Sequence, residues 1–161
     1  MIAFSTKRES DARQLNWPDP GREMINNLLY KSTALLAPKD RRFRLMFDQA
    51  RLRNANMDIT GYLHWEDGMF YQWIEGPAAE LQIVERFIFA STSHRDLTVL
   101  SRNTAQGRQF TGWSMALGIS DEASLFSYVA RRGTATIDQE DYAASILAFM
   151  NVQVRGSDHP G

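Results

Sequence analysis

A two-residue turn near the middle of the chain constrains how its surroundings fold. The dipeptide Asp67-Gly68 stands between the aromatic-rich runs DITGYLHWE and MFYQWIEG, and Asp-Gly in such a place is a strong signal for a β-hairpin. A two-residue turn sets residues that are equally far from it opposite each other, which pairs Leu63 with Gln72. The sequence therefore predicts both a hairpin and its register.

This register gives the hairpin two different faces, because successive side chains of a strand point to opposite sides. One face combines apolar residues with a single amide: Leu63, Trp65, Phe70, Gln72 and Ile74. The other face consists of Tyr62, His64, Tyr71 and Trp73. Such an aromatic surface is too apolar to remain in water. We expect it to be covered by the C-terminal segment of the chain or, alternatively, by a partner or a second subunit.

The segments around the hairpin alternate between strand-like and helix-like patterns. Strands are predicted for MINNLLYKST (24–33), RDLTVLSRN (95–103) and GWSMALG (112–118). Helices are predicted for KDRRFRLMFDQARLRNAN (39–56) and for the segment after Pro77, since both place apolar residues at helical spacing. The order β-α-β-β-α-β-β predicts an α+β, ferredoxin-like sheet with two helices on one face.

Two further helices are predicted at the C-terminal end, in ASLFSYVARR (123–132) and DQEDYAASILAFMNV (138–152). Ser120 is a suitable N-cap for the first of them. We divide the chain into four parts: an N-terminal arm (1–22), one folded domain (23–118), a helical cap (119–154) and a frayed tail (155–161).

The composition argues against several classes of chemistry. The 161 residues include no cysteine, which removes disulfides, thiolate nucleophiles and cysteine-ligated metals. The three histidines show no metal-ligand spacing, and no sequence motif joins a nucleophile to a base, so we expect neither a metal site nor an enzyme. A net charge of −1 argues against nucleic acid. Without a long apolar run we expect no membrane association and a cytoplasmic protein.

Three polar side chains are predicted to point inward beneath the two helices: Tyr30, Asn54 and Gln72. Each has an ordinary explanation on its own, as a core tyrosine, a helix cap and an edge-strand amide. Together they suit a planar ligand whose edge alternates donors and acceptors, because a buried amide without a partner costs about 1–3 kcal/mol. Met46 and Ile88, one from each helix, are placed to contact the two faces of such a ligand.

Five stretches resemble the successive signatures of the BLUF domains, blue-light sensors that use flavin. They are LLYKSTA, ARLRNANMDITGYL, DGMFYQWIEG, SHRDLTVL and RQFTGWSM, and the resemblance spans about residues 25–118. It implies an oxidised flavin, usually FAD with FMN tolerated, between the first two helices.

The resemblance also implies a role for each inward-pointing residue. Asn54 would hydrogen-bond the edge of the flavin ring, with Met46 and Ile88 flanking the ring. Tyr30 would donate an electron and a proton under light, through Gln72. Trp113 and Met115, on the last strand, would carry the change outward.

The chain departs from the family pattern where the second helix ends. Phe87 stands at a usual arginine, and Ser91 and Ser93 stand at a usual aspartate and arginine. The family's residues help to hold the ribityl and phosphate side of the flavin, so their loss predicts a weaker grip, with Arg86 or the basic residues of the first helix as candidate substitutes.

We therefore expect a blue-light photoreceptor that carries no effector domain of its own and signals to a separate partner protein. The aromatic face also leads us to expect a homo-oligomer. The alternative is a flavin-poor, degenerate domain that acts as a protein interaction or dimerisation module. A ferredoxin-like RNA-binding module is disfavoured because the predicted sheet lacks a basic surface.

Overall fold

The computed structural model describes residues 23–157 except 122 and 133–137. These residues form a five-stranded sheet and four helices. In chain order the elements are β1 (Ile25–Ala34), α1 (Arg41–Asn56), β2 (Thr60–Glu66), β3 (Met69–Gly76), α2 (Ala78–Ala90), β4 (His94–Ala105), β5 (Ala116–Ile119), α3 (Leu125–Arg131) and α4 (Gln139–Ser157). The predicted α+β order, with two additional C-terminal helices, is confirmed.

The strands lie in the order β4-β1-β3-β2-β5, so the hairpin occupies the middle of the sheet. All neighbours are antiparallel except β5, which runs parallel to β2. Leu63 lies opposite Gln72 as predicted. Asp67 and Gly68 have φ angles of 48° and 75°, and positive φ at both central residues defines the type I′ turn that Asp-Gly favours.

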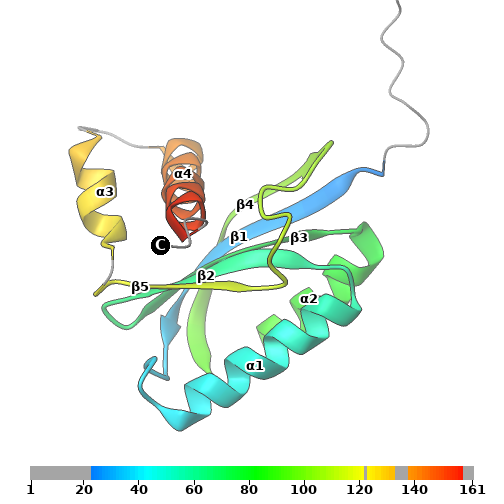
Figure 1. Cartoon of the computed structure of the whole chain (residues 1–161), viewed down its shortest axis with the longest axis horizontal. Helices are drawn as coiled ribbons and strands as arrows, with labels where there is room; N and C mark the ends of the chain where they lie inside the picture. The colour runs from blue at the N-terminus through cyan, green and yellow to red at the C-terminus, as the bar shows by residue number, and fades with distance from the viewer. Residues whose placement is uncertain (1–22, 122, 133–137, 158–161) are drawn as a thin grey trace, which may run out of the picture.

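Helices cover both faces of the sheet, with α1 and α2 on one side and α4 on the other (Figure 1). Beneath α1 and α2 lies an apolar core that includes Leu28, Phe43, Phe70, Ile74 and Val84. On the opposite face, the aromatic side chains of the hairpin pack with residues of α3 and α4: Tyr62, Tyr71, Trp73, Leu125, Ile146 and Phe149. The chain itself thus covers the aromatic face. The homo-oligomer was expected because this face would otherwise be exposed, so the aromatic face no longer supports that expectation.

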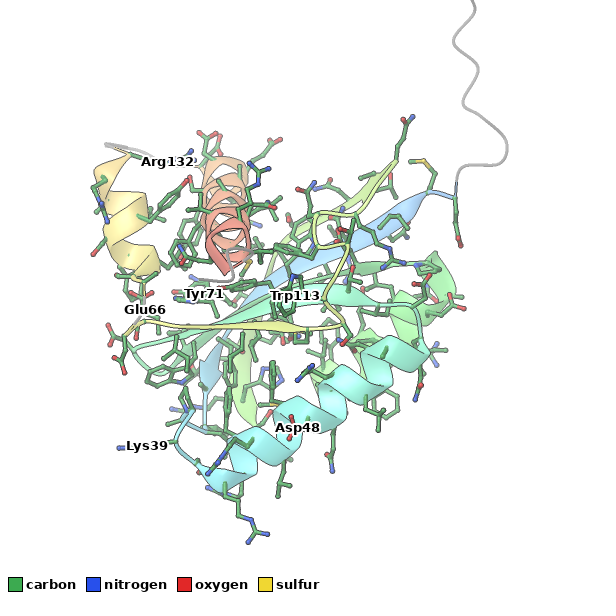
Figure 2. All side chains as sticks on the ribbon, in the orientation of Figure 1. Lys39, Asp48, Glu66, Tyr71, Trp113 and Arg132 are labelled. Carbon is green, nitrogen blue, oxygen red and sulfur yellow. The ribbon has the colours of Figure 1, made fainter. Side chains whose placement is uncertain are left out.

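A buried carboxylate at the end of β2 fixes the start of α3. Glu66 accepts hydrogen bonds from Ser124 Oγ at 2.7 Å, from the Leu125 amide at 2.6 Å and from His64 Nε2 at 2.8 Å. Ser124 also accepts from the Ser127 amide, which makes it the N-cap. The prediction of Ser120 as the cap is therefore wrong, because the helix begins where Glu66 meets its first amides. Figure 2 shows Glu66 beside α3.

The last strand is shorter than the predicted 112–118. β5 begins at Ala116, so Trp113 and Met115 precede the strand and do not lie on it as predicted. The physical reason is a side-chain contact, because Asn54 Nδ2 donates to the carbonyl oxygen of Ser114 at 3.0 Å and so takes an acceptor that a strand would present to its neighbour.

The helix α4 continues through Ser157, past the predicted start of a frayed tail at residue 155. The predicted arm (1–22) and the last residues of the predicted tail (158–161) lie outside the described residues. None of the described helices is long and apolar enough to cross a membrane.

The contact of Glu66 with α3 predicts an acid-sensitive fold. Burial lowers the pKa of His64 from its ordinary 6.5, against the opposing effect of Glu66. Burial acts to raise the pKa of Glu66, but hydrogen bonds from Ser124, His64 and two backbone amides hold it below its ordinary 4.5. For both groups the unfolded chain binds protons at a higher pH than the folded chain, so acid favours unfolding.

We expect the free energy of unfolding to fall as the pH drops below 6.5, and to fall further below 4.5. Urea unfolding at a series of pH values measures this dependence. The His64→Gln variant should lose the part of the slope between these two values. An identical slope in the variant would show that His64 does not carry it.

Candidate functional site

A cavity of about 320 Å³ lies between α1, α2 and the sheet. Five of the seven residues to which the sequence analysis gives a role in binding flavin or in signalling line it: Tyr30, Met46, Gln72, Ile88 and Met115. The two strands β1 and β3 supply its polar floor, and the two helices supply its apolar walls through Met46 and Ile88. Asn54 and Trp113, also singled out, are not among the lining residues.

The floor of the cavity is a chain of three side chains centred on Gln72. Tyr30 lies directly opposite Gln72 on the neighbouring strand, and its hydroxyl donates to Gln72 Oε1. At the other end of the amide, Nε2 donates to Met115 Sδ at 3.4 Å. Both ends of the amide therefore have partners, which accounts for a glutamine in an apolar core.

The phenol of Tyr30 keeps its proton over the whole neutral range. Burial raises the pKa of Tyr30 well above its ordinary value, and the positive charge of Arg53 offsets this only in part. The hydroxyl can therefore act as a hydrogen-bond donor to Gln72 and as a source of one proton.

Asn54 is fully buried and connects α1 to the segment before β5. Its amide nitrogen donates to Ser114, whereas its Oδ1 is buried without a hydrogen-bond partner among the described residues. Trp113 is 38 % exposed and lines a second cavity, which shares Met115 with the first. Figure 2 shows Trp113 close to the start of β5. Asn54 therefore contacts the segment before β5, and Trp113 belongs to that segment, but neither residue lines the first cavity.

His94 also lines the cavity, although it is not among the predicted site residues. Its Nδ1 lies 2.8 Å from Ser32 Oγ and its Nε2 lies 2.8 Å from the carbonyl oxygen of Ile88. Nε2 is the donor in the second contact, because a carbonyl oxygen can only accept. The ring also lies beside Tyr30, with 5.9 Å between ring centroids. His94 thus fixes the end of α2 above β1. The clue in the sequence is its place in SHRDLTVL, one of the five stretches that carry the resemblance.

The departures from the family pattern lie along one wall of the cavity. Ser91 and Ser93 hydrogen-bond to each other at 2.7 Å and bring no charge. Phe87 is 52 % exposed, and the guanidinium of Arg53 lies over its ring, 4.9 Å from the centroid. Of the proposed substitutes, Arg86 is exposed and does not line the cavity, whereas Arg53 does.

The residues of this cavity fit a flavin. The apolar side chains on two helices suit the faces of a planar ring, and the tyrosine, amide and guanidinium supply donors and acceptors for its edge. One polar atom of a lining residue, Arg53 Nε, is buried without a partner among the described residues. The cavity therefore has the shape and the side chains to hold a planar, flavin-like ring.

Comparison with known sequences establishes the family. Residues 25–116 match the BLUF family, described as sensors of blue-light using FAD. The chain therefore belongs to the BLUF family, whose members bind flavin.

Several curated relatives contain a similar segment. The chain is 28 % identical over 138 residues to the blue light- and temperature-regulated antirepressor BluF of Escherichia coli (strain K12), covering 84 % of this chain and 34 % of the relative. It is 28 % identical over 100 residues to photoactivated adenylate cyclase subunit alpha of Euglena gracilis, covering 60 % and 10 %. The chain thus spans about a third or less of the length of these relatives.

Solved structures share the fold. The dark-state structure of the BLUF protein BlrB superposes with a TM-score of 0.69 at 23 % identity, covering 82 % of this chain and 98 % of that one. The photo-activated state of BlsA superposes with a TM-score of 0.69 at 19 % identity, covering 80 % and 95 %.

The contact of Asn54 with Ser114 predicts a stability effect. Replacing Asn54 by alanine leaves the Ser114 carbonyl without its donor and should lower the free energy of unfolding by about 1–3 kcal/mol. Urea unfolding measures the loss. Asn56→Ala, at an exposed position near the end of the same helix, is the matched control and should change little. Equal effects of the two substitutions would contradict a structural role for the Asn54 amide.

Proposed function

We propose that this protein is a blue-light photoreceptor that signals through rearrangement of the hydrogen bonds of Gln72. The observation that carries the proposal is the position of the Gln72 amide, which has Tyr30 at one end and Met115 at the other. Bound oxidised flavin, FAD with FMN tolerated, supplies an electron acceptor that blue light activates.

The side chains that would surround the flavin ring have the chemistry that such a switch needs. The buried phenol of Tyr30 can release an electron and a proton together and take both back, so the cycle leaves no net oxidation. A primary amide has a donor end and an acceptor end on one planar group. Rotation or tautomerisation of Gln72 exchanges these ends with little change in volume and none in charge, which gives two states in one packed site.

Met115 is the first residue beyond Gln72 to sense this change. When Gln72 presents an oxygen where it had presented an N–H, the contact with the Met115 sulfur loses its donor. Met115 borders both cavities and lies two residues after Trp113 in the sequence. We propose that Met115 and Trp113 carry the signal to the surface that β5 and α4 form. Residues 23–118 would then be the light-sensing unit and residues 119–154 the helical output cap.

The receiver of the signal is proposed to be a separate signalling protein. The relative in Escherichia coli is named an antirepressor, which supports a regulatory protein as the receiver. Self-association of the chain, if it occurs, must use a surface other than the aromatic face, because α4 covers that face.

A second candidate function is an interaction module that binds little flavin. The observation in its favour is the loss of charge at Phe87, Ser91 and Ser93, on the side of the cavity where relatives hold the cofactor. Protein that is colourless after purification and does not take up added FAD would support this alternative and contradict the proposed function.

The light response of single variants tests the proposed mechanism. The wild-type protein should be yellow, and blue light should shift its flavin absorption slightly to the red, reversibly in darkness. The variants Gln72→Leu and Tyr30→Phe should keep the flavin and lose the shift, because each removes one partner of the central hydrogen bond.

Tyr71→Phe is the matched control for these variants. Tyr71 neighbours Gln72 in the sequence, but it packs in the core on the opposite face of the sheet. The control should retain the shift. A normal red shift in Gln72→Leu would rule out the mechanism.

A further inference from the structure

The strand β5 forms an open edge of the sheet. The order β4-β1-β3-β2-β5 places β5 beside β2 only, so no strand of the described residues pairs with its other side. At the end of β5, the Ser120 amide donates to the Trp65 carbonyl oxygen at 3.1 Å, toward β2. Because the peptide groups of successive strand residues alternate between the two sides, Leu117 and Ile119 present theirs to the open side. Such an edge is able to pair with a further strand.

The second cavity, of about 240 Å³, follows this open edge and is lined from both faces of the sheet. Phe47 and Met115 line it from the core beneath α1 and α2. Tyr62, Ala116 and Val154 line it from the core that α4 covers. Figure 1 shows β5 running along the edge between α1 and α4. Since an added strand sends successive side chains to opposite faces, it would find apolar contacts on both sides of the edge.

A single arginine gives this cavity its charge. Among the described residues that line it, Arg51 is the only one that is charged at neutral pH, because burial lowers the pKa of His64. The Arg51 guanidinium lies over the ring of Phe47, 6.0 Å from its centroid. No carboxylate of the described residues forms an ion pair with it. Trp113 and Leu117, both exposed, border the same cavity. The edge is therefore complementary to a segment that is both apolar and acidic.

These features together fit one kind of partner. We propose that the open edge of β5 is the docking site of the receiver protein, which adds an extended segment to the sheet and places an acidic side chain beside Arg51. This inference rests on the proposed function, because it takes the docked protein to be the receiver of the light signal. Main-chain hydrogen bonds to Leu117 and Ile119 supply affinity, and the side chains on the two faces supply specificity.

The position of Met115 connects this edge to the light reaction. Met115 directly precedes β5 and accepts a hydrogen bond from Gln72 Nε2 at 3.4 Å. A signal changes the affinity for a partner only if the two states differ in their contacts with that partner. Met115 lines the cavity along the edge, so a rearrangement of Gln72 alters the contacts that a docked segment finds there.

A second copy of the chain fits this edge less well. Two β5 edges that pair around a two-fold axis would bring both Arg51 side chains to the same joint, since Arg51 borders the edge in each copy. Like charges in that position repel each other. The strand also has only four residues, so its main-chain hydrogen bonds are few and the side chains beside the edge decide which partner binds.

Short synthetic peptides test the docking site. The probe is a peptide in which valine alternates with glutamate, titrated into flavin-loaded, isotope-labelled protein and followed by NMR of the backbone amides. The amides of Leu117 and Ile119 should shift. The same peptide with lysine in place of glutamate should bind about threefold to tenfold more weakly, as expected when a partly exposed ion pair becomes a repulsion. The fully N-methylated peptide should not bind, because it has no N–H groups to donate to β5.

Two variants of the protein separate strand pairing from attraction between charges. Leu117→Pro removes an N–H group that points outward, a position at which an edge strand tolerates proline, so the variant should fold and bind about tenfold more weakly. If it does not fold, the N-methylated peptide makes the same test on the wild type. Arg51→Glu should reverse the preference and favour the lysine peptide. Arg86→Glu, the same change of charge at an exposed site on α2, should keep the wild-type preference.

Illumination separates this inference from the proposed function. The Kd of the valine-glutamate peptide should differ between dark and illuminated protein, and the difference should vanish in Gln72→Leu. Protein that shows the red shift but does not bind the peptide, or binds it equally after Arg51→Glu, refutes the docking site alone. Equal Kd values in darkness and light, in protein that shows the red shift, overturn the assignment of the edge to the receiver. Protein without flavin or without the red shift refutes the proposed function.

The oligomeric state supplies the last test. Sedimentation of the protein without peptide should give the same species for the wild type and for Leu117→Pro. A wild-type dimer that this substitution dissociates would assign the edge to a second copy and overturn the proposed partner.

Discussion

The central strand β3 is buried on both faces, and the rest of the structure depends on this constraint. All its residues after Met69 are buried, with Gln72 under α1 and α2 while Tyr71 and Trp73 face α4. A slip of one residue would turn Gln72 toward α4 and force aromatic rings into the cavity. The Asp-Gly turn at the end of the hairpin prevents this slip, so one local signal fixes both cores and the position of the polar site.

Within this rigid frame, the hydrogen bonds of a few side chains can change without a change in packing. The amide of Gln72 contacts Tyr30 on one side and Met115 on the other. Asn54 holds the preceding residue, Ser114, by its carbonyl, so Met115 is kept in place while its donor is exchanged. A polar rearrangement in a tightly packed core is all-or-none, because a half-turned amide would leave buried groups without partners. This property makes the amide a suitable element for a two-state signal.

The sequence predicts best what depends on local pattern. The turn and the two-residue period of the strands fix the hairpin register, and with it the placement of Gln72 opposite Tyr30. The errors arise where a distant side chain determines a boundary. Glu66 moves the start of α3 to Leu125, and Asn54 delays β5, and neither contact leaves a trace in the local sequence. The position of Arg53 in the cavity depends in the same way on a packing partner from another helix, so a sequence reading could name basic residues of α1 only as a group.

The central claim is that light changes the hydrogen bonding of the Gln72 side chain. An infrared light-minus-dark difference spectrum of the flavin-loaded protein, with isotope label in the glutamine side-chain amides, tests it directly. The account predicts difference bands that move with the label and disappear in Gln72→Leu. Difference bands of the flavin without any label-sensitive amide band, in protein that still shows the red shift, would contradict it.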